Sequence, residues 1–166
     1  MSRAIRAPRT SVADMDRLLA AARTARARAH APYSKYRVGA ALLTRAGGLY
    51  AGCNVENATY GATVCAERNA IAAMVAGGDR DPVACVVVTG GPRPGSPCGI
   101  CRQVLAEFAR DMPIVLVAED ARGYIRERTA QSLGALLPLA FRLAAPATPA
   151  APRIPGPGGA KRPRRP

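Results

Sequence analysis

Apolar and polar positions repeat with a helical period at the start of the chain. Between residues 12 and 30 the apolar residues recur three or four positions apart, which predicts an amphipathic helix. Ser11 stands before it as a cap, and Asp14 three residues later can complete a capping box. Pro32 follows, and because the residue before a proline avoids helical conformation, the helix is expected to end near residue 30.

Short apolar runs further along the chain are typical of strands. Val38 to Thr44 and Leu49 to Val55 flank the Gly47-Gly48 pair, which predicts a hairpin. The runs 84–89 and 114–118 are rich in β-branched residues, as buried strands are.

The remaining predicted elements are helices and one weak strand. Helices are expected over 65–76 and 98–110, an edge strand over 124–128 and a short helix over 132–137. The order is helix, strand, strand, helix, strand, helix, strand, strand, helix. This order predicts an α/β fold in which helices cover a mixed sheet.

Length and composition define the extent of the fold. With 166 residues, 17.3 kDa and 49% apolar residues, the chain can form one domain but offers no apolar run long enough for a membrane span. We expect a flexible lead over residues 1–11 and a folded domain over 12–143. Residues 144–166 are rich in Ala, Pro, Gly and Arg, which predicts a disordered basic tail.

The net charge of +13 raises the question of a nucleic-acid partner. Residues 1–12 carry three arginines and residues 144–166 carry five basic residues, neither with any acid, so the rest of the chain has a net charge of only +5. Aromatic residues, on which bases stack, make up only 4%. We therefore expect no specific nucleic-acid recognition.

Cysteines indicate both the compartment and the chemistry. Their odd number, five, and the absence of an apolar leader favour a reducing compartment, the cytoplasm. Cys98 and Cys101 stand three positions apart at a predicted helix start, so both thiols lie on one helix face. Cys65 begins another helix, and helix N-termini favour the metal-binding thiolate. Three such sulfurs predict a zinc site. A zinc-stabilised module that binds nucleic acid through its basic tails remains a rival interpretation.

Three ligands are typical of a catalytic zinc site, which keeps one position for water. Cys53 lies on a predicted strand and Cys85 in an apolar run, so neither is expected to be the fourth ligand. Glu67, two positions after Cys65, can take the proton of that water. The alternative is an acid that only stabilises the helix dipole, but three nearby thiols favour the catalytic interpretation.

Three thiolates on Zn²⁺ leave a net charge of −1, which a nearby cation should offset. Arg68 and Arg102 each stand next to a ligand, and either can simply be solvated. We prefer Arg68 as the partner of the thiolates.

Several ordered motifs resemble those of the small cytidine deaminases, from about Asp14 to Phe141. They are Ala31-Pro32-Tyr33-Ser34, Val38-Gly39-Ala40-Ala41, Gly52-Cys53-Asn54-Val55-Glu56-Asn57-Ala58, Cys65-Ala66-Glu67-Arg68, Ser96-Pro97-Cys98-Gly99-Ile100-Cys101-Arg102-Gln103, and Leu136-Leu137-Pro138 with Phe141. Cys-x-Glu with Pro-Cys-x-x-Cys is the signature of zinc deaminases in general.

The resemblance implies a three-layer αβα sandwich with a five-stranded mixed sheet, and a homotetramer whose active sites are shared between subunits. It also implies hydrolytic deamination of free cytidine and deoxycytidine to uridine and deoxyuridine in pyrimidine salvage. Cys65, Cys98 and Cys101 would hold one zinc ion per subunit. A zinc-activated hydroxide would attack C4, with Glu67 as the proton shuttle.

The resemblance further implies a set of substrate contacts. Asn54 and Glu56 would bind the sugar, since residues two apart on a strand share a face, although turn chemistry is an alternative explanation for both. The Ala66 backbone would hold the base carbonyl. The full set comprises Tyr36, Val38, Asn54, Glu56, Ala58, Tyr60, Ala66 and Phe141, of which Ala58, Tyr60 and Phe141 would reach a neighbouring subunit's nucleoside.

The chain departs from the family pattern at three positions. Tyr36 replaces a Phe that packs on the base, Asn69 replaces a Thr, and Ile100 replaces a small residue. These changes bear on affinity and substrate breadth. A related deaminase of another aminated ring, such as a blasticidin-type antibiotic or a modified nucleoside, is therefore the alternative function.

Overall fold

The computed structural model describes residues 11–143, so the predictions for the basic tail and for residues 1–10 lie outside the described residues. Its elements in chain order are α1 (Val12–Ala27), β1 (Val38–Thr44), β2 (Leu49–Cys53), the 3-10 helix η1 (Tyr60–Ala62), α2 (Ala66–Ala76), β3 (Pro82–Gly90), α3 (Gly99–Phe108), β4 (Pro113–Glu119), β5 (Ile125–Ser132) and α4 (Leu133–Leu136).

The five strands form one mixed sheet in the order β2-β1-β3-β4-β5. β1 pairs antiparallel with both β2 and β3, and β4 pairs antiparallel with β5. β3 and β4 are parallel, and α3 lies in the connection between them. The predicted hairpin and mixed sheet are confirmed.

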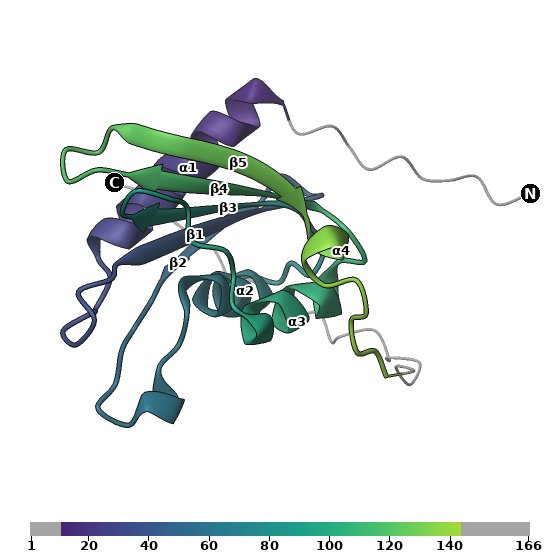
Figure 1. Ribbon diagram of the computed structural model, residues 1–166. Coiled ribbons are helices and arrows are strands. Elements are labelled where there is room, and N and C mark those ends of the chain that lie inside the picture. Colours follow the sequence, from purple (N-terminus) through teal and green to yellow (C-terminus); the bar gives the residue numbers. More distant parts are fainter. Residues whose placement is uncertain (1–10, 144–166) are drawn as a thin grey trace, which may run out of the picture.

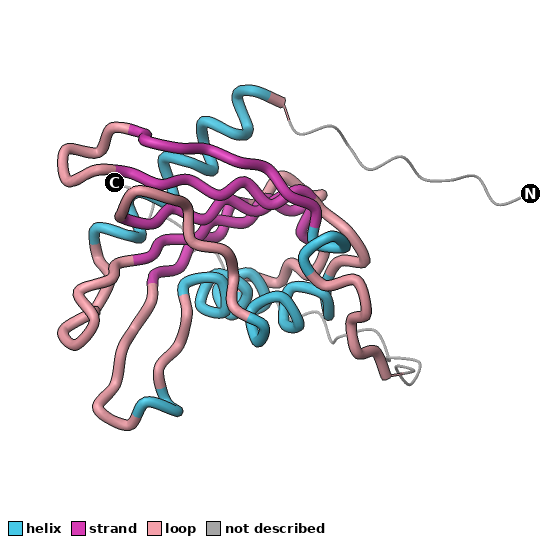
Figure 2. The backbone as a smooth tube through the Cα atoms, viewed as in Figure 1, coloured by secondary structure: helices cyan, strands magenta, loops and turns pink. Residues whose placement is uncertain are grey.

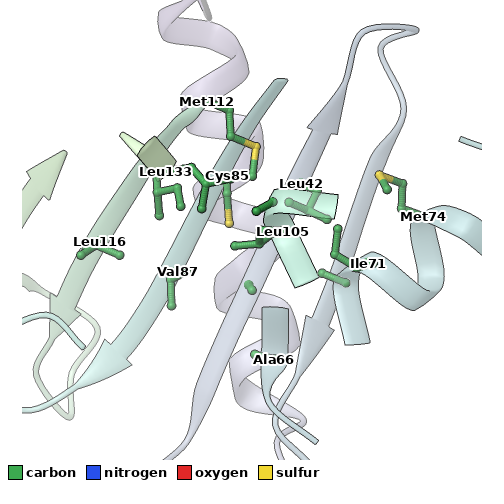
Figure 3. Packing of buried hydrophobic residues seen from close by; sticks show 14 residues of the cluster. Leu42, Ala66, Ile71, Met74, Cys85, Val87, Leu105, Met112, Leu116 and Leu133 are labelled. Carbon is green, nitrogen blue, oxygen red and sulfur yellow. The ribbon is translucent and has the colours of Figure 1, made fainter. Parts of the chain in front are cut away.

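Helices cover both faces of this sheet, which confirms the three-layer arrangement (Figure 1). Figure 2 shows the strands as the middle layer. Successive side chains of β3 point to opposite faces. Val86 and Val88 therefore pack on α1, whereas Cys85 and Val87 join the cluster under α2 and α3 (Figure 3). Cys85 is fully buried there, as predicted.

Two glycines allow helices to approach the sheet closely. A Cβ on Gly39 would lie 2.0 Å from the carbonyl oxygen of Ala22 in α1. A Cβ on Gly52 would lie 2.4 Å from the backbone nitrogen of Ala70 in α2. Because real side chains never come this near to backbone, only glycine fits at either position.

Several boundaries differ from the predicted ones. α1 begins with the predicted capping box of Ser11 and Asp14, but it ends at Ala27. The His30 amide instead donates to the Asn54 carbonyl at 3.1 Å, so the chain leaves the helix early to run beside the exit of β2. β5 continues to Ser132, beyond its expected end. η1 was not predicted.

Within residues 11–143, none of the helices combines the length and the hydropathy that crossing a bilayer requires.

Candidate active site

Three cysteine sulfurs meet where α2 and α3 begin. Cys65 is the N-cap of α2, Cys98 is the N-cap of α3, and Cys101 lies in the first turn of α3. The Cys65 and Cys98 sulfurs are 3.9 Å apart, and those of Cys98 and Cys101 are 3.5 Å apart. Each sulfur lies within 4.8 Å of the other two.

These separations fit a tetrahedral zinc ion. With Zn–S bonds of about 2.3 Å, two sulfurs on one zinc lie roughly 3.8 Å apart, between the two distances observed. In the described part of the chain, no other group of three His, Cys, Asp or Glu side chains could hold an ion. Cys53 and Cys85 both lie outside the group, so the site offers three sulfur ligands.

The thiol of Cys65 is tuned for metal binding. Hydrogen bonds from Cys101 and Cys98, together with the Arg68 guanidinium, lower the pKa of Cys65 to about 5. The thiolate, which is the ligand form, is then the resting state of this residue at neutral pH.

The structure gives different contacts to the two candidate arginines. Arg68 lies beside Cys65 and donates to the Thr63 carbonyl at 2.7 Å, while its Nε is buried without a hydrogen-bond partner among residues 11–143. Arg102 donates to the carbonyls of Pro97 at 2.7 Å and Leu136 at 3.0 Å. Arg68 is therefore placed to offset the thiolate charge, whereas Arg102 binds the loop before α3 to the C-terminal segment.

Glu67 is a buried acid beside these sulfurs. Its side chain is only 4% exposed and lines the same pocket as Cys65 and Cys98. Burial raises the pKa of Glu67, and the neighbouring Cys65 thiolate raises it further. A carboxyl group in this environment holds a proton more readily than a surface glutamate, which suits a group that accepts and then donates one.

The pocket has a volume of about 210 Å³ and contains most of the expected site. Its lining residues are Tyr36, Val38, Asn54, Thr63, Cys65, Ala66, Glu67, Val87, Thr89, Gly95, Ser96 and Cys98. Sulfurs and a carboxyl group thus share one cavity with apolar and aromatic side chains, as expected where a flat ring meets a metal centre.

Asn54 and Glu56 do not share a strand face, so that expectation was wrong. β2 ends at Cys53, and beyond it the two side chains bind different main-chain groups. Asn54 accepts from the Val38 amide and donates to the Tyr36 carbonyl, both at 2.9 Å. It still lines the pocket.

Glu56 lies outside the lining of this pocket. Its carboxylate accepts hydrogen bonds from the Tyr33 amide at 2.9 Å, the Ser34 amide at 3.2 Å and the Ser34 hydroxyl. The bond from the Ser34 hydroxyl is the main cause that lowers the pKa of Glu56. The carboxylate therefore fixes the loop that precedes Tyr36.

Three predicted substrate contacts lie on the surface of the single chain. Ala58 is exposed, Tyr60 is 80% exposed and Phe141 is 67% exposed. None of them lines the pocket. A chain on its own does not bring these residues to its own site.

Sequence reasoning missed some of the pocket wall, including Thr63 and Thr89. Thr89 is near the end of β3, and its hydroxyl accepts from the Gly95 amide at 3.1 Å. The tendency of ligands to bind beyond the carboxyl ends of parallel strands could have identified Thr89. Thr63 lies in an irregular segment with no such signal.

Comparison with known proteins places this geometry in a family. Residues 13–118 match the sequence profile of the cytidine and deoxycytidylate deaminase zinc-binding region. The chain belongs to this family. Its match covers more than half of the chain and includes the three cysteines and Glu67.

Individual deaminases of the family are similar over most of their length. The cytidine deaminase of Sporosarcina psychrophila is 46% identical over 129 residues, which are 77% of this chain and 91% of that protein. The cytidine deaminase of Halalkalibacterium halodurans is 45% identical, over 77% of this chain and 94% of that protein.

Solved structures give the same result for the fold. The crystal structure of cytidine deaminase from Burkholderia pseudomallei has a TM-score of 0.68 and 43% identity, covering 76% of this chain and 98% of the other. The crystal structure of cytidine deaminase from Mycobacterium tuberculosis has a TM-score of 0.65 and 38% identity, and the match covers 78% of this chain and 98% of that one. The family's zinc-binding region and the arrangement of Cys65, Cys98 and Cys101 together establish a zinc-binding deaminase domain.

Proposed function

We propose that this protein hydrolyses cytidine and deoxycytidine to uridine and deoxyuridine, with release of ammonia. The observation that carries this proposal is the buried carboxyl of Glu67 in one pocket with the sulfur ligands. Its similarity to proteins named cytidine deaminase, at 45–46% identity, supports the choice of substrate.

Cys65, Cys98 and Cys101 are the residues that would hold the zinc ion. When bound, zinc supplies Lewis acidity that makes a coordinated water molecule a nucleophile at neutral pH. Arg68 offsets the negative charge that three thiolates bring to the pocket. The partial positive charges of the helix N-termini at Cys65 and Cys98 also offset this negative charge.

Glu67 moves the protons of the reaction. Its carboxylate accepts a proton as water oxygen bonds to C4 of the base, and it passes this proton to ring N3. The remaining water proton travels by the same carboxyl to the 4-amino group, which leaves as ammonia when the C4–N4 bond breaks. Burial favours this shuttle, because it prevents bulk water from competing for the proton.

The pocket wall orients the nucleoside. Tyr36 and Val38 would provide apolar surface for base and sugar, and the Ala66 backbone, at the start of α2 and in the pocket lining, would hold the base carbonyl. Asn54 retains one free amide hydrogen and one free lone pair, which suit a ribose hydroxyl. Glu56, which lies outside the pocket lining and binds the loop before Tyr36, would also contact the sugar.

A homotetramer would explain the exposed aromatic residues. Ala58, Tyr60 and Phe141 are exposed on one chain and would complete a neighbouring chain's site. Large exposed aromatic side chains are typical of surfaces that become interfaces. We propose further that the enzyme works in the cytoplasm, where thiol ligands stay reduced.

Incubation of the purified, zinc-loaded protein with cytidine, deoxycytidine and adenosine tests the proposal. We expect ammonia from the two cytosine nucleosides and none from adenosine. If ammonia is released only from a different aminated ring, cytidine is not the substrate and the alternative deaminase is favoured.

A further inference from the structure

We infer that Arg26 is a positioning residue for the nucleoside pocket, acting through the main chain that carries Tyr36 and Val38. The inference rests on the proposed function, since its effect is on nucleoside binding. Arg26 lies in α1, outside every motif that pointed to the site. Its side chain contacts three other segments of the chain, at Glu119, Arg37 and Gly90.

A buried carboxylate fixes one end of this arginine. Glu119, the last residue of β4, is only 3% exposed. Arg26 Nη1 lies 3.3 Å from its Oε2, and Arg23 Nε binds the other carboxylate oxygen. Because a buried carboxylate without partners is costly, both arginines of α1 are held towards the sheet.

Arg26 then contacts the main chain between two pocket-lining residues. Its Nε donates to the carbonyl of Arg37 at 3.2 Å. Arg37 stands between Tyr36 and Val38, both of which line the pocket. The arginine therefore binds the main chain in the middle of that wall segment.

The same side chain also lies against a second wall. A Cβ on Gly90 would be 2.8 Å from Arg26 Nη2, so Arg26 packs against the end of β3. Gly90 is the last residue of β3, follows the pocket residue Thr89 and precedes the loop that contains Gly95 and Ser96. Arg26 thus contacts the chain next to pocket-lining residues in two segments.

Asn54 holds the first wall from the opposite side. It binds the Tyr36 carbonyl and the Val38 amide, while Arg26 binds the carbonyl between them. The main-chain groups on either side of Arg37 are therefore fixed before substrate arrives. Such preorganisation lowers the entropic cost of binding, so its loss should appear mainly in KM.

Arg23 provides a matched control. It lies one turn earlier in α1 and binds the same Glu119 carboxylate. Its remaining contact is to the Gly123 carbonyl at 3.4 Å, on the turn between β4 and β5. Arg23 therefore shares the buried ion pair with Arg26 but does not contact the pocket wall.

The test compares Arg26→Lys with Arg23→Lys in the full-length, zinc-loaded protein. Lysine keeps a cation for Glu119 but has a single donor nitrogen, so it loses the rigid fork with which Arg26 reaches the carboxylate and the Arg37 carbonyl from two separate nitrogens. For Arg26→Lys we expect KM for cytidine to rise about tenfold with kcat within about threefold of wild type. For Arg23→Lys we expect an unchanged KM. Uridine affinity by calorimetry should weaken in parallel only in Arg26→Lys.

Equal KM values and uridine affinities for the two folded variants would overturn the positioning role. If Arg26→Lys does not fold, Glu119→Gln provides the test, because it removes the carboxylate charge that holds Arg26. A raised KM for cytidine in Glu119→Gln supports the positioning role, and an unchanged KM overturns it. A wild-type protein that releases no ammonia from cytidine would overturn the proposed function, which keeps the two failures distinct.

Discussion

At the scale of single residues, spacing explains why the metal ligands could be predicted. Cys98 and Cys101 are one helical turn apart, and Cys65 caps a second helix, so local geometry alone brings ligands to helix starts. Asn54 and Glu56 were misplaced because their positions depend on where β2 stops and on partners far away in sequence. The periodicity of apolar residues indicates neither where β2 ends nor which distant groups these side chains bind.

Replacement of Glu67 by glutamine should separate proton transfer from binding. The amide has nearly the same shape but cannot accept the proton, so kcat should fall by about two to four orders of magnitude. Zinc content and uridine affinity should stay near wild type. Glu107→Gln, on the exposed side of α3, is the matched control and should keep full activity. Near-normal turnover of Glu67→Gln would remove Glu67 from the proton path.

Replacement of Cys98 by alanine should abolish zinc binding. One sulfur of three is lost, and the thiols that remain cannot complete the site. Metal analysis after dialysis should show far less than one zinc per chain, with activity reduced in proportion. Cys53→Ala, whose sulfur is outside the cluster, should retain the metal. A fully loaded, active Cys98→Ala protein would exclude Cys98 as a ligand.

At the scale of elements, the position of α2 determines the position of the site. Apolar periodicity predicted α2, α3 and the buried strands, because burial on a sheet face or under a helix imposes these patterns. It failed at the ends of α1 and β5, where hydrogen bonds to distant segments decide the boundary. It also gave no sign that Gly52 sets the separation between α2 and the sheet.

Gly52→Ala should disturb this packing. The new methyl group would lie 2.4 Å from the Ala70 nitrogen, so α2 or β2 must shift, at a cost of about 1–3 kcal/mol in the free energy of unfolding. Urea denaturation measures this cost, and zinc affinity should weaken with it. Gly134→Ala in α4 meets its nearest atom only at 3.4 Å and should be nearly neutral. Equal stability of the two variants would contradict the close approach at Gly52.

At the scale of the whole molecule, one chain contains the metal ligands and Glu67 but leaves Tyr60 and Phe141 exposed. The spacing of residues in the sequence could not predict that Tyr60 and Phe141 lie away from their own chain's site, because their role depends on which surfaces other chains cover. Only the resemblance to small cytidine deaminases suggested shared sites. Shared sites require that neighbouring chains cover Tyr60 and Phe141.

Analytical ultracentrifugation should give a particle of four times the 17.3 kDa chain mass. In the proposed tetramer Phe141→Ala would remove a large apolar contact from a neighbouring site, so KM for cytidine should rise by roughly tenfold. Tyr124→Ala, an equally exposed aromatic before β5, is the control and should leave KM unchanged. A monomer with full activity would contradict the shared sites.

Removal of residues 144–166 should leave deamination intact, because every residue assigned to the site lies between positions 36 and 141. KM and kcat of the truncated chain with cytidine, measured beside the full chain, check this expectation. A large loss of turnover would place part of the catalytic apparatus in the tail.

In the proposed reaction three cysteine sulfurs hold a zinc ion, and Glu67 transfers protons beside it as cytidine is deaminated. Zinc content and ammonia release, measured on the same samples as metal is removed by a chelator and then restored, test this dependence on zinc. We predict that activity follows zinc in proportion, reaches its maximum at one ion per chain, and returns when zinc is added back. Undiminished ammonia release from metal-free protein would show that the reaction does not need the zinc ion.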